Sequence, residues 1–165
     1  MQALREKINP VMSVLMIACF AALSILTGCT GETAEAEHPT AMEIGEKIKQ
    51  AVNLDEMKAG DVKKLQKLYN ITEEEVEDFI LFTAPTNVKA EEVAVLIAKD
   101  EGQVENIKKK IIERIEEQEK KFKDYVPDEY YLLEKHVLRT KGRYILLAVS
   151  KEAEQIESAF DEVLK

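Results

Sequence analysis

Apolar residues recur every three or four positions in several stretches after residue 40, which is the spacing of one face of an α-helix. This pattern predicts four helices, over about 41–52, 62–69 and 103–125 and from about 150 onward. Thr40 with Glu43, and Thr72 with Glu75, have the form of capping boxes, which open helices. The longest predicted helix carries an inward stripe made of Val104, Ile107, Ile111, Ile115, Gln118, Phe122 and Tyr125.

Shorter apolar runs predict four strands, at about 79–84, 93–98, 135–141 and 143–150. The first two, FILFTA and VAVLIA, are expected to be buried on both faces or nearly so. Gly142 stands between the last two and can supply the positive φ of a tight hairpin. The order ααββαββα favours an α+β fold of two layers, an antiparallel four-stranded sheet with the helices packed mainly on one face.

The N-terminal segment has the pattern of a signal sequence. Arg5 and Lys7 precede Val11–Leu26, sixteen residues that are apolar except for two serines. A helix of that length reaches roughly 24 Å, which is short of the roughly 30 Å hydrocarbon core of a bilayer. The run ends in Leu26-Thr27-Gly28-Cys29, which resembles the lipobox of bacterial lipoproteins. The resemblance implies lipidation of the Cys29 sulfur, cleavage before it, and a place on the extracytoplasmic face of the cell membrane.

The predicted organisation follows from that site. Residues 1–28 are a signal peptide, residues 29–40 an acidic tether without large apolar side chains, and residues 41–165 a single α+β domain. The alternatives are an uncleaved signal anchor and an ordinary secretory signal. Cys19 is a poorer lipidation candidate, because the apolar run before it is only eight residues long and Phe20 continues the hydrophobic sequence after it.

Composition narrows the function classes. A hydrophobic content of 45% with 33% charged residues is typical of a folded chain. The formal net charge of −9 argues against nucleic acid as a partner, and it also disfavours anionic wall polymers and anionic lipid headgroups. Both cysteines, Cys19 and Cys29, precede the predicted domain, so that domain has neither a disulfide framework nor a thiolate metal site.

A search for chemistry finds no catalytic motif, no metal site and no cofactor site. Asp55 to Asp61 lacks the oxygen ligands that an EF-hand loop needs, and there is no HExxH, GxSxG or phosphate-binding glycine loop. His136 has no partner motif and is expected to face solvent from a strand. Ser150 is better explained as a helix cap than as a nucleophile.

The long predicted helix carries one polar constellation. Gln118 falls within its apolar stripe, and Arg114 lies one turn earlier on the same face. The structural interpretation is that both side chains bond to carbonyls or carboxylates across the helix–sheet contact. The functional interpretation is that Arg114, Gln118 and Tyr125 line a pocket for a carboxylate or another polar group. Tyr144 is a fourth weak binding candidate, although tyrosines also serve at the edge of a core.

Residues 113–150, with FILFTAP and EEVAVLIAKD before them, resemble a bacterial domain of unknown function, family number 4358. The family's motif positions match at Arg114, Gln118, Phe122, Tyr125, Pro127, Gly142 and Tyr144. The resemblance covers about 41–165 and implies a lipoprotein-type signal, but it implies no activity.

These observations favour a membrane-anchored, extracytoplasmic binding or protein-interaction module of the cell envelope. Its expected partners are the membrane, through lipidated Cys29, and either another envelope protein or a small ligand. The alternative is an envelope enzyme or inhibitor with a carboxylate- or His-based site. A third interpretation is a structural lipoprotein without a ligand.

Overall fold

The computed structural model describes residues 38–165, and the chain from Pro39 to Lys165 forms one unit. The predicted signal peptide, the lipobox with Cys29 and most of the predicted tether lie outside the described residues. None of the described helices is long and apolar enough to cross a membrane.

The fold is α+β with an antiparallel sheet, as predicted, but the sheet has five strands and not four. The strands are β1 (Lys58–Ala59), β2 (Val76–Thr83), β3 (Glu92–Ala98), β4 (Val137–Lys141) and β5 (Tyr144–Val149), and they lie in the order β1-β2-β3-β5-β4. The unpredicted strand, β1, pairs with Thr83 and Phe82 at the end of β2. A two-residue strand is too short to produce a periodic pattern, so the sequence could not signal it.

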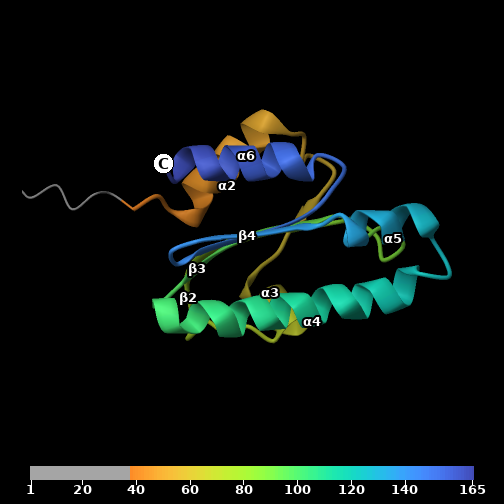
Figure 1. Ribbon diagram of the computed structural model, residues 1–165, viewed down its shortest axis with the longest axis horizontal. Helices are drawn as coiled ribbons and strands as arrows, with labels where there is room; N and C mark the ends of the chain where they lie inside the picture. The colour runs from red at the N-terminus through yellow and green to blue at the C-terminus, as the bar shows by residue number, and fades with distance from the viewer. Residues whose placement is uncertain (1–37) are drawn as a thin grey trace, which may run out of the picture. The chain divides into compact units, whose positions relative to one another are not determined.

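Helices cover both faces of the sheet, so the prediction of two layers with helices mainly on one face was wrong (Figure 1). The helices of one face are α2 (Ala41–Ala51) and α6 (Ala153–Val163). Those of the other are α3 (Val62–Tyr69), α4 (Val104–Phe122) and α5 (Pro127–Glu134).

The central strands β3 and β5 explain the third layer, because they are buried at every position. Successive side chains of a strand point to opposite faces. In β3, Ala94 and Leu96 pack beneath α4, whereas Val93 and Val95 pack beneath α2 and α6. A strand without polar alternation needs cover on both sides, and the two sets of helices supply it.

Side-chain caps fix where several helices begin. Thr40 and Glu43 form the predicted capping box at the start of α2. The second predicted box also forms its hydrogen bond, from the Thr72 backbone N–H to Glu75 Oε2 at 3.0 Å, but it closes only a turn. No helix follows there, because β2 begins at Val76 and pairs with β3. The expectation that this second box opens a helix was therefore wrong.

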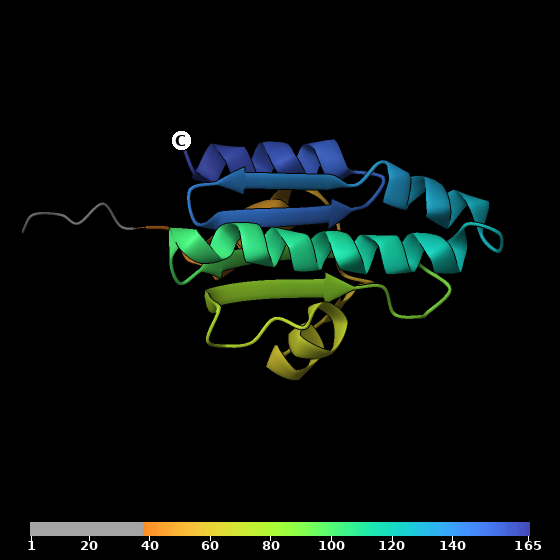
Figure 2. The same ribbon diagram turned by 60° about the horizontal axis from the view of Figure 1, so that its bottom comes forward.

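Helices α3 and α4 lie on the same face of the sheet, and the candidate site described below lies between them at one end of the sheet. Figure 2 shows α4 lying across the middle of the sheet and α3 beside β2. The β2–β3 connection, residues 84–91, lies at the end of β2 that pairs with β1. At the other hairpin, Gly142 adopts a φ of +55°, which confirms the predicted tight turn between β4 and β5.

Candidate functional site

An open cleft of about 370 Å³ lies where β1, α3, α4 and the β2–β3 connection meet. Its charged lining consists of Lys58, Lys64, Lys89, Glu91, Glu92, Arg114 and Lys121, and Thr83 and Gln118 also line it. We call this hollow the lysine cleft. It gathers five cationic side chains in one place on a chain with a formal net charge of −9.

A buried polar cluster forms one wall of the lysine cleft. Arg114 of α4 donates from Nη2 to Oε2 of Glu92, at 2.9 Å, and the Tyr69 hydroxyl donates to the other oxygen of Glu92. The Glu92 side chain is 6% exposed and that of Arg114 is 15% exposed, so both charges are largely removed from water. Burial, together with the Glu92 charge, raises the pKa of Tyr69 well above its usual range. Arg114 Nε is buried without a hydrogen-bond partner.

A second buried carboxylate holds the β2–β3 connection in place. Glu129 of α5 accepts the backbone N–H of Ala90 and the ammonium group of Lys89, each at 2.7 Å. Its hydrogen bond and its charge raise the pKa of Lys89. Since Glu129 is buried and Lys89 is half-exposed, this pair ties the loop to α5 while the ammonium group stays at the cleft.

The remaining cations of the cleft contact neutral groups. Lys64 of α3 donates to the Thr83 hydroxyl, and Lys58 of β1 donates to the Pro85 carbonyl oxygen at 3.2 Å. The ammonium group of Lys121 lies 5.1 Å from the centre of the Phe122 ring. None of these three ammonium groups forms an ion pair with a carboxylate of the described residues.

The four predicted binding candidates separate into two groups. Arg114 and Gln118 both line the lysine cleft, as residues one turn apart on α4 should. Tyr125 does not join them, because α4 ends at Phe122 and Tyr125 is 78% exposed. Tyr144 is buried on the opposite face of the sheet, because in β5 it alternates with Ile145 and faces α2 and α6.

The contacts of Arg114 agree with both the structural and the functional interpretation. It bonds to a carboxylate across the helix–sheet contact, as the structural interpretation requires, and it also lines a cleft. The sequence reasoning missed its partners, Glu92 and Tyr69, as well as Glu129. Glu92 did leave a signal, because it is a carboxylate that directly precedes the buried run VAVLIA, where a charge needs a partner.

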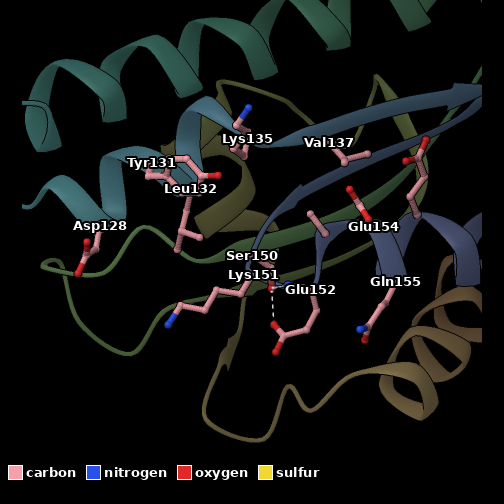
Figure 3. A pocket seen from close by; sticks show the side chains of 12 residues that line it. Asp128, Tyr131, Leu132, Lys135, Val137, Ser150, Lys151, Glu152, Glu154 and Gln155 are labelled. Carbon is pink, nitrogen blue, oxygen red and sulfur yellow. Dashed lines mark hydrogen bonds between the residues drawn. The ribbon is translucent and has the colours of Figure 1, made fainter.

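A larger hollow of about 910 Å³ lies between α5, β4 and the start of α6. Figure 3 shows the charged side chains of Asp128, Lys135 and Lys151 pointing in different directions around it. Ser150 donates to the Glu152 carboxylate at 2.9 Å and accepts from its backbone N–H, so the hydroxyl serves the turn before α6. Without convergent groups, this hollow is a weaker candidate than the lysine cleft.

His136, the one histidine of residues 41–165, is half-buried and lies just before β4. Its Nδ1 lies 2.6 Å from the Leu133 carbonyl oxygen. Within residues 38–165, no group of three or more His, Cys, Asp or Glu side chains is placed to hold a metal ion.

Comparison with known families identifies the domain. The family model described as Domain of unknown function (DUF4358) matches residues 50–150. The chain belongs to this family. The match confirms the resemblance seen in the sequence, and its range includes every cationic side chain of the lysine cleft. No curated protein and no solved structure matches the chain. Because the family description names no activity, the function has to be argued from the cleft.

Proposed function

We propose that this chain is a lipid-anchored, extracytoplasmic binding module that takes an anionic ligand in the lysine cleft. The observation that carries the proposal is the concentration of five cationic side chains around one cleft. Glu92 and Glu129 compensate two of them, Arg114 and Lys89. The other three, Lys58, Lys64 and Lys121, have no ion-pair partner among the described residues, so a bound anion would compensate their charge. A volume of about 370 Å³ is also within the range of small-molecule sites.

The anchoring half of the proposal rests on the sequence. Leu26-Thr27-Gly28-Cys29 fits a lipobox at all four positions, and the preceding apolar run is short for a membrane span. Two or three acyl chains hold a protein durably at a membrane, because each buried CH₂ contributes about 0.8 kcal/mol. An anchored domain of this kind would present its cleft to ligands outside the cytoplasm.

The binding half is tested with the full chain in nonionic detergent, by thermal unfolding in the presence of glutamate, citrate, phosphate, glucose or choline at constant ionic strength. At least one anion should raise the Tm of the wild type, whereas the neutral and cationic compounds should not. Constant ionic strength separates binding from general screening of the lysines.

Two charge reversals on the same helix locate the effect. Lys64→Glu places a negative charge in the cleft, whereas Lys63→Glu changes the net charge equally at an exposed position outside it. The anion effect should vanish in Lys64→Glu and persist in Lys63→Glu. If no anion stabilises the wild type, or if both variants respond alike, the cleft is not the ligand site.

The anchoring half is tested by metabolic labelling with a fatty acid. Cys29→Ala should abolish the label and leave an unprocessed precursor, while Cys19→Ala should keep both the label and the processing. Labelling that survives in Cys29→Ala would contradict the lipid anchor without affecting the binding proposal.

A further inference from the structure

The charges of the lysine cleft do not cancel internally. Among the residues that the structure describes, Arg114 pairs with Glu92 and Lys89 pairs with Glu129, but Lys58, Lys64 and Lys121 form no ion pair. The only other carboxylate in the cleft lining is that of Glu91. Three unpaired ammonium groups against one carboxylate leave an excess of two positive charges, which matches a doubly charged anion better than a singly charged one.

The type of the free donors narrows the ligand further. A guanidinium group recognises a planar carboxylate through two parallel hydrogen bonds, but Glu92 of the protein already engages the only arginine of the cleft. The donors that remain are ammonium groups, which act as point charges with rotatable protons. They approach from three elements, β1, α3 and α4. Such an arrangement suits a tetrahedral oxyanion, which has acceptors in several directions.

Thr83 supplies a neutral donor at the same place. Thr83 is 5% exposed, and its hydroxyl oxygen accepts a hydrogen bond from the Lys64 ammonium group. A hydroxyl that accepts in this way still has its own proton to donate. A ligand oxygen that contacts Lys64 can therefore also accept a hydrogen bond from the Thr83 hydroxyl.

From these contacts we infer that the lysine cleft binds a phosphate group, either as free phosphate or as a phosphomonoester. This inference rests on the proposed function, since it names the chemistry of the ligand for the same site. A phosphomonoester carries a charge of about −2 near neutral pH, in line with the charge excess of the cleft. Lys58, Lys64 and Lys121 bind its oxygens, and Thr83 donates the neutral hydrogen bond.

Isothermal titration calorimetry of the full chain in nonionic detergent tests the inference, with inorganic phosphate and with citrate at equal ionic strength. Phosphate should bind saturably, and more tightly than citrate. Lys64→Glu should weaken phosphate binding by about tenfold or more, which corresponds to one lost charge-assisted hydrogen bond. Thr83→Val should weaken it several-fold, whereas Thr83→Ser, which keeps the hydroxyl, should not.

Matched controls protect the test from folding defects. Lys63→Glu should bind phosphate like the wild type. If Lys64→Glu unfolds, Lys121→Glu replaces it, with the exposed neighbour Lys120→Glu as its control. Equal phosphate binding by the wild type and by folded cleft variants would overturn the inference.

A second arm distinguishes the source of the phosphate. Phosphatidylcholine vesicles with and without phosphatidic acid are sedimented with the full chain carrying Cys29→Ala, which removes the anchor proposed at that residue. Cleft-dependent binding that requires phosphatidic acid supports a lipid phosphomonoester, and binding of inorganic phosphate alone supports a soluble one. If citrate binds in the cleft and phosphate does not, the inference fails and the proposed function survives. If no anion binds, both fail.

Discussion

Arg114 of α4 and Glu92 of β3 form an ion pair that joins the helix to the central sheet, with 2.9 Å between Nη2 and Oε2. Both groups are largely withdrawn from water, and the Tyr69 hydroxyl occupies the second oxygen of the carboxylate. A pair of this kind contributes little net stability when it is intact, because desolvation opposes the attraction between the charges. Removing one member, however, leaves the other charge buried without compensation.

We therefore expect Arg114→Met to lower the free energy of unfolding by about 3 kcal/mol, measured by urea denaturation. The double variant Arg114→Met with Glu92→Leu should recover part of that loss, although Tyr69 then lacks its acceptor. Lys109→Met, which breaks an exposed pair with Glu113 on the same helix, should cost less than about 1 kcal/mol. The single variant Glu92→Leu completes the cycle: if the loss in the double variant equals the sum of the losses in Arg114→Met and Glu92→Leu, the two residues are not coupled as described.

Tyr69 predicts how the protein responds to alkaline pH. Its folded-state pKa is raised by burial and by Glu92, so the stability it contributes is complete below the unfolded value of about 10. That contribution is lost as the pH rises above about 10 and towards the folded-state pKa. Tyr69→Phe lacks the hydrogen bond to Glu92 at every pH, and because it has no hydroxyl to ionise, its stability does not fall for this reason at alkaline pH.

The stability difference between the wild type and Tyr69→Phe should therefore narrow above about pH 10 in urea titrations. Tyr125→Phe is the matched control, because Tyr125 is 78% exposed. Its stability should run parallel to that of the wild type across the same range. A constant difference between the wild type and Tyr69→Phe would contradict the buried hydrogen bond.

Most helices and strands were predictable from the sequence, but the faces of the sheet that the helices cover were not. The run VAVLIA predicts a strand buried on both faces or nearly so, and such a strand needs helices on both sides of the sheet. The element order alone does not state which face each helix covers, because that depends on the handedness and length of the connections. Val93 and Val95 pack in the core on one face of the sheet, and Ala94 packs in the core on the other. Which helices cover each face follows from this alternation only when the strand order is also known.

The site was predictable only in part, for a similar reason. Arg114 and Gln118 are neighbours on one helix, so their spacing in sequence places them together. Lys58, Lys64 and Lys89 come from elements that only the tertiary fold brings to α4. The net charge of −9 gives no sign of this local excess of positive charge, because it is summed over the whole chain.

The presence of helices on both faces has a direct mutational consequence. Leu146 and Leu147 are neighbours in β5, and each is almost fully buried, one beneath α2 and α6 and the other beneath α4. Leu146→Ala and Leu147→Ala should each lower the free energy of unfolding by about 2–5 kcal/mol in urea denaturation. Ile112→Ala, at a side chain that is 43% exposed, should cost less than about 1 kcal/mol. A negligible effect at either leucine would contradict the three-layer arrangement.

Glu75 predicts a loss of stability in acid. Burial alone would raise its pKa, but hydrogen bonds from Lys110 and Thr72 and the charge of Lys110 outweigh that effect and lower the pKa. Lys110 Nζ lies 2.6 Å from the Glu75 carboxylate and ties α4 to the turn before β2. Because the folded-state pKa is the lower one, the contribution of this contact is complete above the unfolded value of about 4.3.

That contribution disappears as the pH falls below about 4.3 and through the folded-state pKa of Glu75. The wild type should therefore exceed Glu75→Gln in unfolding free energy near pH 7, and the difference should shrink steadily below about pH 4.3. Glu74→Gln, at an exposed position one residue away, controls for the change in net charge. Urea denaturation at a series of pH values measures all three proteins. A difference that persists unchanged at low pH would mean that the contact with Lys110 does not depend on the carboxylate charge.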